Sequence, residues 1–214
     1  MSSMIPRVII LDFDGTLVES VGIKDKAFRE LFSDYPEHLD AIMAYHLAHN
    51  ATVRFIKFKH ITEYILRETY TPRREKKLSV RFFQLVFKQI IACPFVPGAL
   101  DFLGYFYGKI PLYLVSISPA EEFDVILKAR DLKRFFKDIY AVPWVKVDAI
   151  NDILAKEKIA RSEAVFIGDT QEDYDSALAA GVLFIGCNSG KFYSSAVDFL
   201  NKDMVGVKNS ILTM

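Results

Sequence analysis

Two carboxylates stand close together where an apolar run ends near the start of the chain. Val8–Leu11 has no polar alternation, as is typical of a strand buried on both faces, and it leads into Asp12 and Asp14. Burying two like charges this close without a cation would shift each pKa by about a unit or more. Ordinary turns and calcium loops share the letters D-x-D-G, but the position after a buried strand favours a divalent metal site.

A second pair of acids follows another apolar run. Ala164–Ile167 leads into Gly168, Asp169 and, one helical turn later, Asp173. Oxygen atoms from these acids could complete an octahedral Mg²⁺ shell together with Asp12, a backbone carbonyl and waters. Asp173 also lies near a predicted helix start, where it could instead be a helix cap or a partner of the helix dipole.

Uncharged polar residues and a lysine accompany these acids at predicted strand ends. Gly15 permits a sharp turn, and Thr16 adds a hydroxyl beside the site. Ser116 ends a strand, and its hydroxyl and the amides that follow, such as that of Ser118, could hold an anionic oxygen. Lys146 follows the next strand and could neutralise a phosphoryl group or tether an acid. Their order along the chain indicates an anion site beside the metal site.

Short apolar runs alternate with helical patterns along most of the chain. The predicted buried strands are Val8–Leu11, Leu112–Ser116, Ile139–Val142, Ala164–Ile167 and Leu183–Gly186. The predicted helices are one after Pro97-Gly98 with Leu100, Leu103 and Phe106 in helical spacing, then Ala120–Ala129 and Val147–Lys158. This alternation predicts a parallel α/β sheet with right-handed crossovers, in which ligands bind beyond the carboxyl ends of the strands.

The segment 18–92 interrupts this alternation. No crossover between the first strand and the next needs so many residues, so we expect an inserted domain. Its apolar residues recur at helical spacing and predict four or five short helices. We therefore divide the chain into an α/β core, residues 1–17 and 93–214, and a helical cap domain, residues 18–92. The polar tail after Asn201 is expected to be a loosely attached end.

The composition argues against several classes of protein. The chain has 214 residues, 51% of them hydrophobic and 25% charged, which is enough to bury a substantial core. Its formal net charge is zero, so no nucleic-acid or membrane-surface partner is expected. No segment approaches the roughly 20 apolar residues of a membrane helix. Cys93 and Cys187 are too few for a disulfide framework, which suits a cytoplasmic protein.

Taken in order, these motifs resemble those of the haloacid dehalogenase superfamily. Its phosphatases carry D-x-D-G-T, a strand-end Ser or Thr, a Lys and G-D-x-x-x-D, and the matching elements here are D-F-D-G-T, Ser116, Lys146 and G-D-T-Q-E-D. The helical insertion after the first motif is similar to the cap of phosphoglycolate phosphatases and β-phosphoglucomutases. The resemblance implies a Rossmann-like parallel sheet flanked by helices, with a small inserted all-helical cap.

The resemblance also implies roles for the acids. Asp12 would be the nucleophile that forms an aspartyl-phosphate, and Asp14 would protonate the leaving oxygen and then activate water. Mg²⁺ would be held by Asp12, the Asp14 carbonyl and Asp169, with Asp173 nearby through water or in an outer shell. A dehalogenase is not expected, because dehalogenases resemble this pattern but lack a second acid at the position of Asp14.

Substrate contacts are expected from both domains. Ser116 and Lys146 would bind the transferring phosphoryl oxygens, as the resemblance implies. Arg54 and Lys57 share a helix face at a spacing of three residues, a pattern that fits a substrate-facing helix and a solvated surface helix equally well. The further substrate-binding candidates are Gly15, Thr16 and Ser118 in the core and His49, Asn50, Arg54 and Lys57 in the cap.

Three functions fit these observations. The first is a Mg²⁺-dependent phosphatase of a small phosphorylated metabolite, such as a sugar phosphate or phosphoglycolate, acting as a monomer or homodimer. The second is a phosphosugar mutase, which would return the phosphate of Asp12 to the sugar. The third is a non-enzymatic switch in which phosphorylation of Asp12 changes a partner interaction, although such modules need no cap.

Overall fold

The contacts within the chain divide it into two units. The structure, a computed structural model, describes residues 5–49, 52–187 and 199–214. The core unit comprises Met1–Glu19 and Pro94–Met214, and the inserted unit comprises Ser20–Cys93. These boundaries lie within two residues of those expected from the sequence. Among the described residues, every helix is too short or too polar to cross a bilayer.

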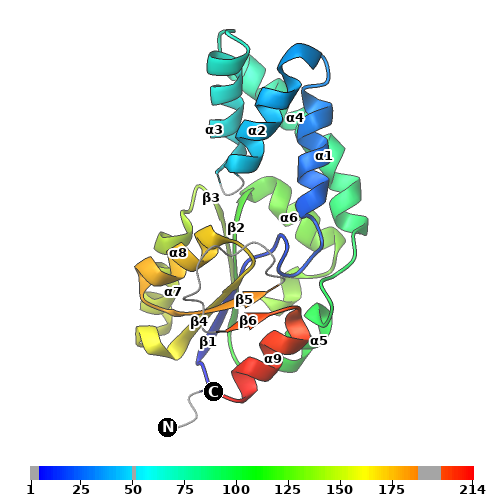
Figure 1. The fold of residues 1–214 in the computed structure, drawn as a ribbon. Coiled ribbons are helices and arrows are strands. Elements are labelled where there is room, and N and C mark those ends of the chain that lie inside the picture. The colour runs from blue at the N-terminus through cyan, green and yellow to red at the C-terminus, as the bar shows by residue number, and fades with distance from the viewer. Residues whose placement is uncertain (1–4, 50–51, 188–198) are drawn as a thin grey trace. The chain divides into compact units, whose positions relative to one another are not determined.

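The core unit is built on a parallel sheet, as the sequence predicts. Its strands follow the order β3-β2-β1-β4-β5-β6 (Figure 1). The strands are β1 Val8–Leu11, β2 Leu112–Pro119, β3 Asp138–Val142, β4 Ala164–Gly168, β5 Leu183–Cys187 and β6 Leu200–Asn201. The helices are α5 Ala99–Phe106, α6 Ala120–Ala129, α7 Lys146–Glu157, α8 Gln171–Ala180 and α9 Met204–Leu212, with short 3₁₀ turns at Lys133–Phe135 and Arg161–Glu163.

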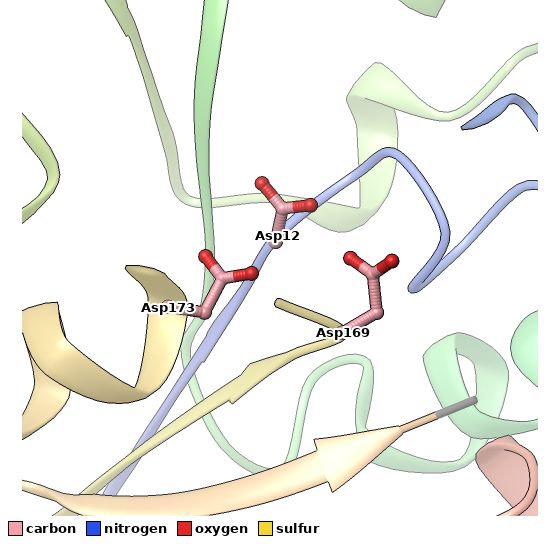
Figure 2. Close-up of side chains that lie close together, drawn as sticks. All are labelled: Asp12, Asp169 and Asp173. Atoms are coloured by element: carbon pink, nitrogen blue, oxygen red, sulfur yellow. The ribbon is translucent and has the colours of Figure 1, made fainter. Parts of the chain in front are cut away.

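The strand register brings the two acidic motifs to one edge of the sheet. Leu11, the last residue of β1, pairs with Ile167 of β4. Asp12 therefore leaves β1 beside the end of β4, where Asp169 follows Gly168 (Figure 2). Because parallel strands present their carboxyl ends together, the topology alone places both motifs where α/β proteins bind ligands.

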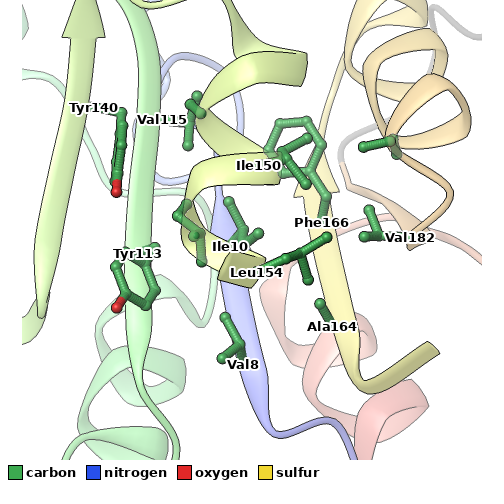
Figure 3. Close-up of a cluster of buried hydrophobic side chains, with 14 of the residues drawn as sticks. Val8, Ile10, Tyr113, Val115, Tyr140, Ile150, Leu154, Ala164, Phe166 and Val182 are labelled. Atoms are coloured by element: carbon green, nitrogen blue, oxygen red, sulfur yellow. The ribbon is translucent and has the colours of Figure 1, made fainter. Parts of the chain in front are cut away.

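One face of the sheet is covered by α7 and α8. Val8 and Ile10 point to this face and pack with Ile150 and Ile153 of α7 and Ala177 of α8, all fully buried or nearly so (Figure 3). On the other face α9 contacts α5 and β5, and α6 contacts β2 and β3. Every residue of β1 is buried, which explains the absence of polar alternation in this run.

The inserted unit is helical in its described residues. It contains α1 Val21–Leu31, a 3₁₀ turn at Pro36–His38, α2 Leu39–Ala48, α3 Arg54–His60, a π-helical turn at Ile61–Ile65 and α4 Pro72–Ala92. Its interior is aromatic: Phe28 lies 5.6 Å from Phe58 and 5.1 Å from Phe82, measured between ring centroids. At 21 residues α4 is not one of the short helices expected from the sequence.

The structure corrects three further expectations. The tail after Asn201 is not loose, because Met204, Val207 and Ile211 of α9 are fully buried. In α5, Phe102 is buried whereas Leu100 is 45% exposed, so the buried face is rotated from the predicted one. Ser116 does not end its strand, because β2 continues to Pro119 with an irregular register after Val115.

Candidate active site

Four charged side chains converge at the carboxyl edge of the sheet. Asp12, Asp169 and Asp173 each contribute a carboxylate oxygen, and these oxygens lie within 4.8 Å of one another (Figure 2). The Nζ atom of Lys146, the first residue of α7, lies 2.9 Å from Asp12 Oδ1 and 2.5 Å from Asp173 Oδ1. All four are residues that the sequence singles out, and they come from three separate segments of the chain.

Two glycines make room for these carboxylates. A side chain at Gly15, where φ is +79°, would place its Cβ 2.1 Å from Asp169 Oδ2. A Cβ at Gly168 would lie 2.5 Å from Cβ and Cγ of Asp173. Both glycines are therefore required by close approach, and Gly15 also by its left-handed backbone conformation.

Burial determines the electrostatics of the site. It raises the pKa of Asp12 to about 7, a shift that Lys146 opposes and the carboxylates of Asp173 and Asp14 increase. Burial and then the charges of Asp12 and Asp173 raise the pKa of Asp169 well above its usual range. Burial alone would lower the pKa of Lys146, but Asp12 and Asp173 outweigh it and raise that pKa. The single positive charge of Lys146 therefore does not neutralise the three clustered carboxylates.

The donor set fits a hard divalent cation. Asp169 Oδ1 is buried and accepts no hydrogen bond from the described residues, a costly state that a bound cation would relieve. Carboxylate oxygens are the ligands that Mg²⁺ and Ca²⁺ prefer. Asp12 and Asp169 are the best placed, because both oxygens of Asp173 already accept hydrogen bonds, from Lys146 and from Thr170.

The predicted anion-binding residues lie along the same edge. Ser116 is buried, and its Oγ accepts a hydrogen bond of 3.1 Å from the amide of Ser118, so its own hydroxyl hydrogen is left to donate. This bond engages the Ser118 amide, which the sequence predicts as a possible hydrogen-bond donor to an anion. Thr16 is fully buried, and its Oγ1 has no hydrogen-bond partner among the described residues. Asp14 is half-buried in the turn after β1.

The candidates in the inserted unit have dissimilar surroundings. His49 is exposed, and its Nδ1 lies 2.8 Å from the carbonyl oxygen of Tyr45. The guanidinium of Arg54 lies over the rings of Phe55 and Phe82, 5.2 Å from each centroid. Asn50 lies outside the described residues.

Lys57 does not share the surroundings of Arg54, although both lie on α3. Lys57 is only 4% exposed, and its Nζ lies 3.3 Å from Nδ1 of His46. Nε2 of His46 lies 3.0 Å from Asp25 Oδ1, and Phe28 stacks on the imidazole at 3.8 Å between centroids. The three polar groups come from α3, α2 and α1, so no local pattern in the sequence could have revealed the cluster.

Comparison with known proteins places the chain in a family. The profile of a family described as haloacid dehalogenase-like hydrolase matches residues 9–187, which include all four converging residues. The chain belongs to this family. The expectation drawn from the motifs is thereby confirmed.

Relatives of this haloacid dehalogenase-like hydrolase include named phosphatases. The chain is 28% identical over 115 residues to the phosphoglycolate phosphatase of Escherichia coli strain K12, a match that covers 51% of this chain and 46% of that protein. The chain thus spans about half the length of the curated relatives it matches.

Two solved structures share the fold of this hydrolase. A crystal structure of a predicted phosphoglycolate phosphatase from Haemophilus somnus 129PT has a TM-score of 0.76 at 17% identity, covering 95% of this chain and 97% of the other. YfnB of Bacillus subtilis, a putative hydrolase of this superfamily crystallised with bound magnesium, has a TM-score of 0.75 at 15% identity, covering 97% and 99%.

One residue that contacts the site of this hydrolase was not predicted from the sequence. Thr170 precedes α8, and its Oγ1 lies 2.6 Å from Asp173 Oδ2. The signal was present, since Thr170 and Asp173 have the spacing of a capping box, in which an N-cap hydroxyl and an acid three residues later bind each other's backbone amides.

Proposed function

We propose that this chain is a Mg²⁺-dependent phosphatase that hydrolyses a small phosphorylated metabolite through an aspartyl-phosphate on Asp12. The observation that carries the proposal is the convergence of Asp12, Lys146, Asp169 and Asp173 at the carboxyl edge of the sheet. Such a cluster combines a carboxylate nucleophile, a fixed cation and oxygen ligands for a metal. These are the parts that phosphoryl transfer to an acid requires.

The first step would transfer the phosphoryl group to the protein. A carboxylate oxygen of Asp12 attacks phosphorus in line with the ester oxygen, and the bond from phosphorus to that oxygen breaks. Asp14 gives its proton to the departing oxygen, so the product leaves as a neutral alcohol. Lys146 and the hydroxyl of Ser116 would bind the equatorial phosphoryl oxygens, and Thr16 is a further candidate donor because its hydroxyl has no hydrogen-bond partner within the described part of the chain.

The second step would release inorganic phosphate. Asp14, now a carboxylate, takes a proton from water as the water oxygen attacks phosphorus. The bond between phosphorus and the Asp12 oxygen breaks, which restores the carboxylate of Asp12. The same acid thus serves as proton donor and then as proton acceptor.

Asp12, Asp169 and the Asp14 carbonyl would hold the metal, with Asp173 next to them. When bound, Mg²⁺ supplies the positive charge that lets a dianionic phosphate approach a carboxylate. Asp169 Oδ1 is buried and accepts no hydrogen bond from residues 5–49, 52–187 or 199–214, which supports this assignment, and so does the magnesium bound in the crystals of YfnB.

The inserted unit would act as a cap that selects the substrate. The core offers contacts to phosphate and little else, so specificity must come from elsewhere. We assign Arg54, His49 and Lys57 as candidate substrate contacts, with Arg54 the foremost because the Lys57 ammonium is hydrogen-bonded to His46. The names of the curated relatives favour 2-phosphoglycolate as the first metabolite to test.

A substrate screen with matched controls tests this proposal. The purified chain is incubated with 2-phosphoglycolate, sugar phosphates and p-nitrophenyl phosphate, with Mg²⁺ or with a chelator, and released phosphate is measured. We expect release that needs Mg²⁺ and is absent in Asp12→Asn. Conversion of a sugar phosphate to its isomer without net phosphate release would instead indicate a mutase. No release from any ester, with the protein folded and Mg²⁺ present, would reject the phosphatase assignment.

A further inference from the structure

Both carboxylate oxygens of Asp173 accept hydrogen bonds, and the donors belong to two different residues. Its Oδ1 accepts the 2.5 Å hydrogen bond from Nζ of Lys146. Its Oδ2 accepts the Oγ1 hydroxyl of Thr170 at 2.6 Å and the Thr170 amide at 3.1 Å. Asp173 is fully buried, so water does not compete for either oxygen. Its rotamer is therefore fixed by Thr170 on one side and Lys146 on the other.

These bonds form a continuous chain that ends at the nucleophile. Thr170 holds Asp173, Asp173 holds Lys146, and Lys146 Nζ lies 2.9 Å from Asp12 Oδ1. The side chain of Lys146 is flexible in water, since its four-carbon stem has many rotamers of similar energy. Here it is only 11% exposed and is directed by its two carboxylate partners.

Helix capping alone does not account for the Thr170 side chain. As the N-cap of α8, Thr170 Oγ1 accepts a hydrogen bond of 3.3 Å from the Asp173 amide. Thr71 plays the same part at the start of α4, where its Oγ1 accepts from the Arg74 amide at 3.2 Å. Thr170 differs in donating its own hydroxyl hydrogen to a buried carboxylate, at a shorter distance than its capping bond. A hydrogen bond to a charged group is among the stronger kinds.

We propose that Thr170 is a positioning residue for phosphoryl transfer: it orients Asp173 so that Lys146 is held against Asp12. The proposal rests on the proposed phosphatase function and extends it to a residue that would act through Asp173. The capping box therefore has two roles. The hydrogen bonds donated by the backbone amides of Thr170 and Asp173 stabilise the start of α8, and the bond from the Thr170 hydroxyl to the Asp173 carboxylate orders the active site. The two uses can be tested apart.

The test compares three single variants with the wild type. Thr170→Val keeps the shape of the side chain but removes the hydroxyl, and Thr170→Ser keeps the hydroxyl. Thr71→Val is the matched control, because it removes a threonine N-cap outside the site. We expect Thr170→Val to lower kcat/KM for p-nitrophenyl phosphate roughly 10-fold to 100-fold, as for loss of a hydrogen bond to a charged group. Thr170→Ser should stay within roughly 3-fold of the wild type and Thr71→Val should match it, although both valine variants lose some thermal stability.

A double-mutant cycle separates positioning from general damage. If Thr170 acts through Asp173, adding Thr170→Val to Asp173→Ala should cost no more than about 2-fold beyond Asp173→Ala alone. A merely structural role predicts losses that multiply. Multiplying losses, or a Thr170→Ser variant as impaired as Thr170→Val, would overturn the proposal.

Crystal structures of the wild type and of Thr170→Val provide a readout that needs no activity. We expect Asp173 to change rotamer in the variant and Lys146 Nζ to move out of hydrogen-bonding distance of Asp12. If Lys146 keeps both carboxylate partners in the variant, the proposal is wrong whatever the enzyme does. If the wild type releases no phosphate, the proposed function fails, and the two structures still decide whether Thr170 positions Lys146.

Discussion

Replacing Lys57 by methionine should remove a pH dependence from the stability of the protein. Burial, followed by the charge of Lys24, lowers the pKa of Lys57 from 10.5 to about 8, and Asp25 opposes this shift. His46 is the hydrogen-bond acceptor for the Lys57 ammonium, and burial lowers the pKa of His46 as well. The ring of Phe28 lies 5.0 Å from Lys57 Nζ. A charged amine in these surroundings is poorly solvated.

The sign and size of the effect follow from proton linkage. Between pH 8 and pH 10.5, the two pKa values of Lys57, the unfolded chain binds a proton at this residue more readily than the folded protein does. The free energy of unfolding must therefore rise with pH in this window. With those two pKa values, the rise between about pH 7 and about pH 9.5 is roughly 2 kcal/mol. Methionine does not titrate, so the variant should lack this rise.

Urea unfolding followed by far-UV circular dichroism at several pH values measures the effect. The useful range ends near pH 9.5, because burial raises the pKa values of Tyr70, Tyr113 and Tyr140 and their ionisation in the unfolded chain then opposes the trend. Lys59→Met is the matched control, since Lys59 is an exposed lysine on the same helix. It should keep the wild-type slope. A Lys57→Met variant with the same slope as the wild type would refute the burial of this amine.

Three further predictions concern the site and the cap. Gly168→Ala places a Cβ 2.5 Å from the Asp173 side chain, so we expect at least a roughly 10-fold loss of turnover together with a lower Tm, and unchanged values of both would contradict the close packing. Asp14→Asn should slow phosphoryl transfer less for p-nitrophenyl phosphate than for an ester with a poor leaving group, and equal losses in single-turnover experiments would reject the acid role. Arg54→Ala should lower kcat/KM roughly 10-fold to 100-fold for the native metabolite and little for p-nitrophenyl phosphate, whereas equal losses would assign Arg54 to folding of the cap.

Much of the core could be predicted because its signals are local. Four consecutive apolar residues identify β1, and α6 spans Ala120–Ala129 as the helical spacing predicts. The acids of the site follow strands directly, and parallel topology brings strand ends together whatever the details of packing. This is why Asp12 and Asp169 could be placed at one edge without knowledge of the contacts between them.

The features that were missed depend on contacts between distant segments or on weak local signals. α9 contains Gly206, Asn209 and Ser210, which disfavour helix, and its stability comes from burying Met204 and Ile211 against the rest of the core. The burial of Lys57 could not be predicted because α1 and α2 bring Asp25 and His46 close to it, and spacing within α3 carries no information about them. In both α9 and Lys57, contacts with distant segments of the chain determine the burial that local sequence does not reveal.

Trapping the phosphorylated residue tests the central claim most directly. The purified protein with Mg²⁺ is mixed with p-nitrophenyl phosphate and quenched in acid within a turnover, and the acyl phosphate is reduced with borohydride and located by peptide mass spectrometry. We predict that the modified residue is Asp12, and that Asp12→Asn remains folded, acquires no modification and loses activity by several orders of magnitude. Phosphate release without modification of Asp12, or near-native turnover by Asp12→Asn, would contradict the account.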